Sequence, residues 1–163
     1  GYRLKERFPD NLGVFTIPLG VPEVIREGTD ITVVTYGTMC RIVYDAAELL
    51  AERDISVEII DVQTLMPYDK KSIIVEHIKK TNKVIFADED VPGAASAFMM
   101  QQVLDKQGAY EYLDAPAKTI SAPHHRPAYA TEGDYFSKPN IDLVYNTIYD
   151  LMHNFNPEKY PAL

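Results

Sequence analysis

Hydrophobic and polar residues follow two different periods along this chain, and the change from one period to the other marks the predicted elements. Short runs rich in β-branched residues predict strands at 21–26, 31–36, 56–61, 83–87 and 118–122. Apolar residues recurring every three or four positions predict helices at 38–52, 69–80, 94–105 and 141–153. The predicted order is therefore two strands followed by a regular alternation of helix and strand.

Strands that alternate with helices must be joined by crossovers, which favours a mostly parallel sheet with helices on both faces. The first two strands are separated only by the turn-rich tetrad Glu27-Gly28-Thr29-Asp30, which predicts an antiparallel hairpin. Thr38 and Asp69 are expected to cap the first and second helices. Ligands usually bind at the carboxyl ends of such strands, which here means the turns after Tyr36, Asp61, Ala87 and Ala122.

Length and composition are those of one globular domain. The chain has 163 residues, 46% of them hydrophobic, and no run approaches the roughly 18 apolar residues of a membrane span, so we expect a soluble domain. It begins with Gly1 rather than Met, so we expect it to start inside a longer protein. We expect an N-terminal arm at 1–20, the folded domain at 21–153 and a C-terminal tail at 154–163.

Charge and cysteine content narrow the possible partners and compartment. The formal net charge of −8 argues against a nucleic-acid partner, because phosphate binding requires a positive surface, and it permits docking to a basic protein segment. The single cysteine, Cys40, lies in an apolar helical pattern, where a buried and inert thiol is expected. A reducing, cytoplasmic location fits this thiol.

Candidate chemistry is sparse. Tyr36-Gly37-Thr38 has a single glycine before a helix, which favours a capping turn over a phosphate loop. Asp88-Glu89-Asp90 could supply metal ligands or an acid/base pair, but consecutive residues rarely converge, so a solvated loop is favoured. The adjacent His124 and His125 should diverge, with no third ligand at a suitable spacing. We expect His77 on a solvated helix surface and His153 at a helix end.

Several segments, in order along the chain, carry a resemblance. They are Ile17-Pro18-Leu19-Gly20, residues 26–37, residues 57–69, Lys79-Lys80-Thr81-Asn82-Lys83, Tyr112-Leu113-Asp114-Ala115-Pro116 and Arg126-Pro127-Ala128-Tyr129-Ala130. Together they resemble the C-terminal domain of the beta subunit of thiamine-diphosphate-dependent 2-oxoacid dehydrogenases. The match runs from about Tyr2 to His153.

The resemblance implies a fold and a parent enzyme. The fold is that of the transketolase C-terminal domain, a three-layer α/β/α sandwich with a mostly parallel five-stranded sheet that includes one antiparallel strand. The parent enzyme decarboxylates a 2-oxoacid on thiamine diphosphate with magnesium and reductively acylates lipoyl groups. In the family, the cofactor and the catalytic histidine of the beta subunit lie in other domains. The resemblance therefore implies no catalytic, cofactor-binding or metal-binding residue here, and an inactive isolated domain.

The resemblance also implies partners: an alpha subunit or a fused alpha half, a second beta copy and the lipoyl acyltransferase core. In relatives, the loop after the last strand places an acidic residue against the basic subunit-binding domain of the acyltransferase, whereas His124 stands at that position here. Histidines there would make docking sensitive to pH near their ordinary pKa of about 6.5. The alternative is a plain connection made rigid by Pro123 and Pro127. The candidate docking residues are His124, His125, Arg126 and Tyr129, with Tyr160 and Leu163 as anchors of a tail that either docks on a neighbour or frays.

Other assignments stay open from the sequence. The matching domain of a transketolase or deoxyxylulose-phosphate synthase would share the fold, although Asp114-Ala115-Pro116 and Tyr129-Ala130 favour the dehydrogenase. A free-standing α/β binding module would need a ligand pocket of its own. Pyruvate and 2-oxoisovalerate both remain possible substrates, and general likeness leans to the branched-chain type.

Overall fold

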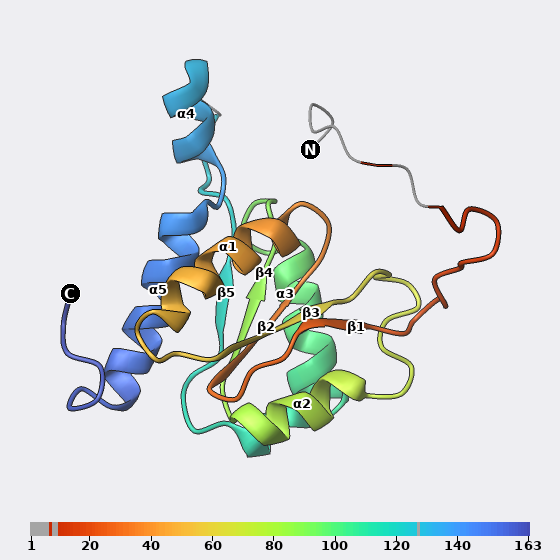
Figure 1. Ribbon diagram of the computed structural model, residues 1–163, viewed down its shortest axis with the longest axis horizontal. Coiled ribbons are helices and arrows are strands. Elements are labelled where there is room, and N and C mark those ends of the chain that lie inside the picture. The colour runs from red at the N-terminus through yellow and green to blue at the C-terminus, as the bar shows by residue number, and fades with distance from the viewer. Residues whose placement is uncertain (1–6, 8–9, 127) are drawn as a thin grey trace.

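The computed structural model describes residue 7, residues 10–126 and residues 128–163 (Figure 1). Part of the predicted arm and Pro127 therefore lie outside the described residues. The strands are β1 (Glu23–Arg26), β2 (Ile31–Thr35), β3 (Val57–Asp61), β4 (Val84–Ala87) and β5 (Lys118–Ile120). The helices are α1 (Met39–Ala51), α2 (Ile73–Thr81), α3 (Ala95–Met100), α4 (Ala130–Ser137) and α5 (Ile141–Phe155), with a π-helix η1 (Gln101–Lys106) and a 3-10 helix η2 (Ala109–Tyr112). None of the helices in the described part of the chain has the length and apolar character needed to cross a membrane.

The strands form one sheet in the order β1-β3-β2-β4-β5. β2 pairs in parallel with β3 on one side and with β4 on the other, and β4 pairs in parallel with β5. β1 is the antiparallel strand, and its partner is β3 rather than β2. The predicted α/β class and mostly parallel sheet are confirmed, whereas the predicted hairpin between the first two strands is wrong.

The tetrad at 27–30 explains the difference, because it crosses the amino end of β3 instead of reversing tightly. The amides of Thr29 and Asp30 donate hydrogen bonds to the Ser56 carbonyl oxygen, at 3.2 and 2.9 Å. A Cβ atom at Gly28 would lie 2.2 Å from the backbone nitrogen of Glu58. The connection thus passes so close to β3 that only glycine fits, which leaves room for β3 between the two strands.

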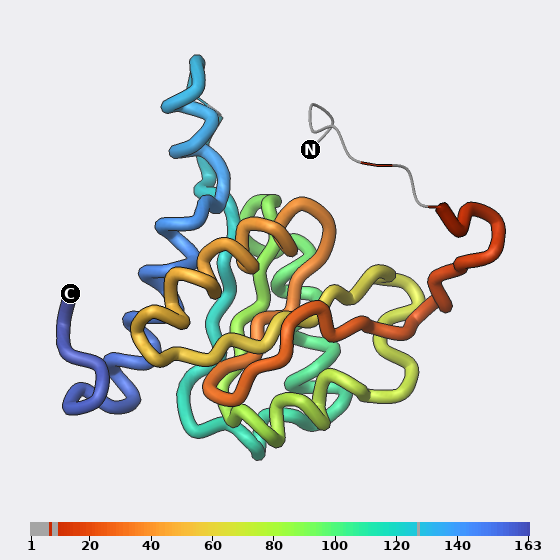
Figure 2. Tube along the Cα trace, in the orientation of Figure 1, coloured from red at the N-terminus to blue at the C-terminus, as the bar shows by residue number. Residues whose placement is uncertain are grey.

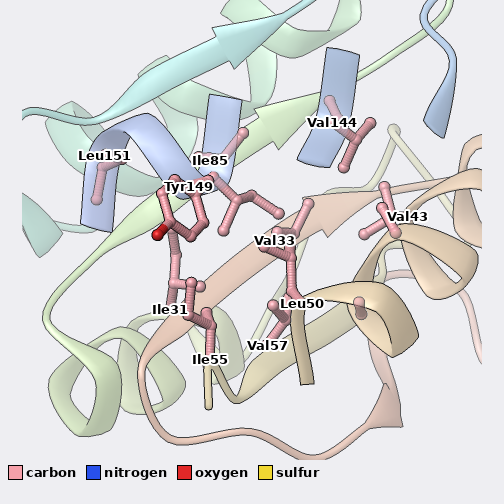
Figure 3. Close-up of a cluster of buried hydrophobic side chains, with 14 of the residues drawn as sticks. Ile31, Val33, Val43, Leu50, Ile55, Val57, Ile85, Val144, Tyr149 and Leu151 are labelled. Atoms are coloured by element: carbon pink, nitrogen blue, oxygen red, sulfur yellow. The ribbon is translucent and has the colours of Figure 1, made fainter. Parts of the chain in front are cut away.

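Two hydrophobic clusters fill the space between the sheet and its helices. Neighbouring residues of a strand face opposite sides of a sheet, so Val33 belongs to one cluster and Val34 to the other. The first cluster joins the sheet to α1 and α5 (Figure 3). The second joins it to α2, α3 and η1. The result is the expected three-layer α/β/α arrangement.

The predicted helices at 38–52 and 141–153 agree with α1 and α5 to within two residues, whereas α2 begins at Ile73, four residues after its predicted start. Asp69 caps α2 as predicted, because its two carboxylate oxygens accept from the amides of Ile73 and Ile74, each at 2.9 Å. The side chain of Thr38 makes no capping hydrogen bond to α1, so that prediction is wrong. The predicted helix at 94–105 changes to π geometry after Met100, and α4 has no counterpart among the predicted elements.

The C-terminal tail packs on its own domain, so the frayed alternative is wrong. The side chain of Tyr160 is 3% exposed and belongs to the first core cluster. Tyr149 Oη donates to the Pro161 carbonyl oxygen at 2.8 Å, and His153 Nδ1 lies 2.6 Å from the Tyr160 carbonyl oxygen. The described part of the N-terminal arm behaves differently and leads away from the domain (Figure 2).

The close approach of the crossing connection to β3 gives a testable prediction. Gly28→Ala should lower the free energy of unfolding by roughly 3 kcal/mol, the upper end of overpacking costs, because the new methyl group would overlap backbone atoms of β3. Urea denaturation followed by circular dichroism measures the change. Thr29→Ala is the matched control, since that side chain is exposed and should matter by less than about 0.5 kcal/mol. Equal stability of Gly28→Ala and the unmodified chain would contradict the crossing.

Candidate functional site

The carboxyl edge of the sheet is the first place to look for chemistry, because the turns after the parallel strands meet there. Cys40, after β2, is half-buried and lies beside Asp61 at the end of β3. Burial, reinforced by the charge of Asp61 and by a hydrogen bond to it, raises the pKa of the Cys40 thiol to about 12. A thiol with that pKa carries almost no thiolate near neutrality, so we expect Cys40 to be unreactive, and it is less buried than predicted.

Asp88, after β4, is completely buried, so the prediction of a solvated loop is wrong for this residue. Its carboxylate accepts hydrogen bonds from the amides of Ser96 and Asp90, at 2.5 and 3.2 Å. Burial is the main reason that the pKa of Asp88 is raised. Glu89 and Asp90 are exposed, as a solvated loop requires. Asp88 therefore shapes the turn and the start of α3, and both of its oxygens are already engaged.

The residues at this edge do not fit thiamine diphosphate with magnesium. The side chains that end or follow the strands include the carboxylates of Asp61, Asp88 and Asp90, which would repel a diphosphate. Among residues 7, 10–126 and 128–163, no group of three or more His, Cys, Asp or Glu side chains could hold a metal ion. We therefore derive no catalytic step through the cofactor in this domain.

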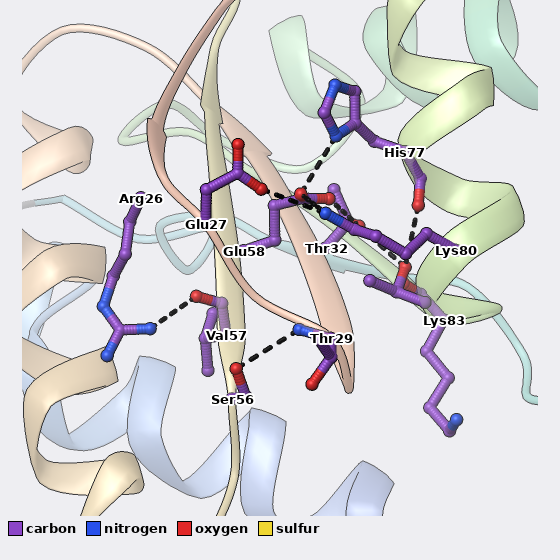
Figure 4. A network of polar contacts seen from close by, with 11 residues as sticks. Arg26, Glu27, Thr29, Thr32, Ser56, Val57, Glu58, His77, Lys80 and Lys83 are labelled. Carbon is purple, nitrogen blue, oxygen red and sulfur yellow. Dashed lines mark hydrogen bonds and ion pairs between the residues drawn. The ribbon is translucent and has the colours of Figure 1, made fainter.

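A buried polar cluster lies at the opposite, amino end of the strands and centres on Glu58 of β3 (Figure 4). The Glu58 side chain is 0% exposed. Its carboxylate accepts from Thr32 Oγ1 at 3.0 Å, lies 2.9 Å from His77 Nδ1 and pairs with Lys80 Nζ. Lys80 also pairs with Glu27 at 3.1 Å.

The structure corrects the prediction for His77. The sequence analysis also did not predict that Glu58, His77 and Lys80 form one cluster. His77 was expected on a solvated surface, but its side chain is 23% exposed and faces Glu58. The sequence signal was an acidic residue inside a buried strand together with His77 and Lys80 three positions apart on one helix face. The hydrogen bond from Lys80 to Glu58 is the main reason that the pKa of Lys80 is raised. The carboxylate is surrounded by its own partners, so the cluster ties α2 to the sheet and offers no open position to a substrate.

The predicted docking residues lie where the chain leaves the sheet after β5. His124, His125, Arg126 and Tyr129 are all exposed. Arg126 Nη2 donates to Tyr129 Oη at 2.6 Å, so these two side chains come together. His125 instead stacks on Phe136 of α4, with ring centres 5.4 Å apart. The helix α4 stands away from the rest of the domain in Figure 1.

The two predicted tail anchors lie in different environments. Tyr160 is buried in the core of its own domain, so it is not available to a neighbouring subunit. The aromatic ring of Tyr160 packs in the first hydrophobic cluster, a position that the sequence pattern did not predict. Leu163 is 68% exposed and stays a candidate contact.

Both the sequence and the fold of this chain are similar to those of known proteins. The profile of the family described as transketolase, C-terminal domain, matches residues 20–140. The chain belongs to this family. A structure described as a split gene transketolase, inactive beta4 tetramer, superimposes with a TM-score of 0.67 at 20% identity, covering 88% of this chain and 45% of that one. At that identity the likeness concerns the fold alone.

The curated relatives are beta subunits, and the predicted resemblance to such subunits is confirmed. The acetoin:2,6-dichlorophenolindophenol oxidoreductase subunit beta of Bacillus subtilis is 36% identical over 123 residues, which are 76% of this chain and 35% of that protein. The 2-oxoisovalerate dehydrogenase subunit beta of the same organism is 36% identical over 109 residues, covering 67% and 33%. The pyruvate dehydrogenase E1 component subunit beta of Rickettsia felis is 35% identical over 105 residues, covering 64% and 32%. The chain spans about a third of the length of these relatives.

The Glu58 cluster predicts a large effect of one substitution. Glu58→Ala should lower the free energy of unfolding by about 1.5–3 kcal/mol, because it removes the charged hydrogen-bond partner of Thr32, His77 and Lys80 from a buried position, while Lys80 keeps its contact with Glu27. Glu76→Ala is the control, since it removes an exposed ion pair with Lys79 and should cost less than about 1 kcal/mol. Thermal or urea unfolding measures both variants. Similar losses in the two variants would show that the cluster is not the joint between α2 and the sheet.

Cys40 provides a test of the carboxyl edge. At pH 8, a pKa of about 12 leaves on the order of a thousandfold less thiolate than the ordinary value of about 8.5. The native chain should therefore react with a disulfide reagent about a thousandfold more slowly than the urea-unfolded chain at pH 8. The reaction rate of the native chain should rise as the pH approaches 12. Cys40 is the only cysteine, so the colour released reports this residue alone. Rapid reaction of the native chain at pH 8 would contradict the inert environment.

Proposed function

We propose that this chain is the C-terminal assembly and docking domain of the beta subunit of a 2-oxoacid dehydrogenase. The similarity to beta subunits at 35–36% identity is the observation that carries the proposal. The parent enzyme would decarboxylate a 2-oxoacid, pyruvate or 2-oxoisovalerate, on thiamine diphosphate and reductively acylate the lipoyl groups of an acyltransferase core. At the carboxyl edge of the sheet, Asp88 is bonded to backbone amides of its own domain. This arrangement supports the proposal that the domain performs no step of the reaction itself.

The surface of the domain supports a role in assembly. The arm that precedes β1 exposes a series of large apolar side chains to solvent, which are Leu12, Val14, Phe15, Ile17 and Leu19, at 49–86%. A continuous apolar segment of this kind is typical of a surface that another protein region covers. We assign the arm to contacts with the remainder of the beta subunit and with the alpha subunit or a fused alpha half.

The docking part of the proposal concerns the loop after β5 and the neighbouring helix α4. Its exposed residues are His124, His125, Arg126 and Tyr129, to which the tail adds Leu163. Aromatic rings and arginine are enriched at protein interfaces. We assign these residues to contacts with a second beta copy or the acyltransferase core, in the cytoplasm. Thiamine diphosphate and magnesium would be held by the other domains of the parent enzyme.

The relative that uses acetoin favours a second candidate substrate. Its similarity extends over 123 residues of this chain, at the same 36% identity as the 2-oxoisovalerate relative over 109 residues. Acetoin cleavage on thiamine diphosphate would use the same beta-subunit architecture, so acetoin belongs in the assay beside the two 2-oxoacids.

An activity assay tests the proposed function. The chain alone and the full-length parent protein with its alpha part are each supplied with thiamine diphosphate, magnesium and 2,6-dichlorophenolindophenol as electron acceptor. Pyruvate, 2-oxoisovalerate and acetoin are offered separately. We expect dye reduction only by the complete assembly, and the preferred substrate then names the enzyme. Dye reduction by the isolated chain, or none by the assembly with any of the three, would contradict the proposal.

A further inference from the structure

The sulfur-containing side chains of this chain differ widely in their access to solvent. The chain has one cysteine and five methionines, and all of them lie in the described residues. Met66 is 82% exposed, whereas Met100 is half-buried. The three methionines that are at most 2% exposed, each packed in one of the two core clusters, are Met39, Met99 and Met152. One thioether is therefore open to solvent while three are enclosed.

The turn between β3 and α2 leaves the Met66 side chain outside the core. Leu65 and Tyr68, which flank the pair of Met66 and Pro67, both pack against the second core cluster. Thr64 Oγ1 donates to the Pro67 carbonyl oxygen at 3.0 Å, so a hydrogen bond spans the turn around Met66. Because its neighbours are anchored on the core, the thioether of Met66 is exposed in the folded chain without any opening of the domain.

Exposure decides how fast a thioether is oxidised, since the oxidant must reach the sulfur atom. A peroxide in solution can meet the sulfur of Met66 directly. A methionine in the core is reached only when the surrounding structure opens, and the opening of core elements requires a large part of the free energy of global unfolding. Met66 should therefore react well before the three buried methionines.

Cys40 is the competing sulfur group, because an exposed thiolate reacts readily with peroxides. Cys40 is half-buried, and burial is the main cause that raises the pKa of its thiol to about 12. The susceptibility of a cysteine follows its thiolate character and its exposure, and Cys40 has little of either. The thiol is therefore disfavoured as the first target, and the exposed thioether of Met66 takes its place.

We propose that Met66 is an oxidation site of this domain, at which a peroxide converts the thioether to a sulfoxide while Cys40 stays a thiol. The sulfur atom attacks one peroxide oxygen, and the S–O bond forms as the O–O bond breaks. The proton of the transferred oxygen passes to the second oxygen, which leaves as water or an alcohol. Sulfur loses two electrons, which reduce the peroxide. A methionine sulfoxide reductase reverses the modification with electrons from thiols. The inference does not depend on the activity of the parent enzyme.

Treatment of the chain with hydrogen peroxide near neutral pH tests the proposal. Samples are quenched at intervals, and peptide mass spectrometry gives the rate at which each methionine gains an oxygen atom. We expect Met66 to react first, with rates at least about tenfold lower at the three buried methionines. When Met66 is fully oxidised, a disulfide reagent in urea should still count one thiol per chain, from the single cysteine. In chain that is unfolded in urea before treatment, the five methionines should react at similar rates.

Matched variants locate the reaction. Met66→Leu preserves the size and apolar character of the side chain and should remove the fast uptake of the first oxygen atom. Met100→Leu, the same change at the half-buried methionine, should alter the rate of that first uptake by less than about twofold. The proposal is overturned if the Cys40 thiol is lost before Met66 is oxidised, or if a buried methionine reacts as fast as Met66. It is also overturned if Met66→Leu takes up its first oxygen atom as fast as the unmodified chain.

Discussion

The position of β3 between β1 and β2 is the constraint on which the other layers depend. It requires a backbone crossing that only glycine allows at position 28, where a Cβ atom would lie 2.2 Å from the Glu58 nitrogen. It also encloses Glu58 completely, and a buried carboxylate is tolerated only when it is paired and hydrogen-bonded. Lys80 and His77 supply those partners from α2, so the charge in the strand fixes where that helix packs. On the other face, Arg26 donates to the Val57 carbonyl oxygen at 2.6 Å and pairs with Glu48 of α1 at 3.3 Å.

Local rules predicted the parts of the fold that depend on nearby residues. The alternation of helix and strand followed from periodicity, and the cap formed by Asp69 followed from its place before an apolar helical pattern. Strand order did not follow, because the tetrad at 27–30 is as compatible with a tight reversal as with a crossing. The deciding contact is with Ser56 and Glu58, about thirty residues away along the chain. Tyr160 shows the same limit, since nothing in its polar surroundings signals a ring inserted into a distant core.

Two side chains at the carboxyl edge of the sheet, Cys40 and Asp88, make contacts within their own domain. In open α/β sheets this edge usually receives the ligand. Here the buried carboxylate of Asp88 uses both oxygens on backbone amides, and Cys40 is held as a thiol by burial and by Asp61. Asp88 therefore stabilises the turn after β4. Missing motifs led the sequence analysis to expect no catalytic residue, but they did not show that Asp88 is bonded to backbone amides of its own domain.

The two edge strands of the sheet, β1 and β5, have different surroundings. Next to β1, the arm residues Phe15 and Ile17 line a hollow of about 500 Å³ with Val24, and both side chains remain about half or more exposed. β5 has no neighbouring strand on one side, Pro116 before it lacks an N–H donor, and Lys118 places a positive charge in the strand. Such features discourage open-ended association of identical sheets.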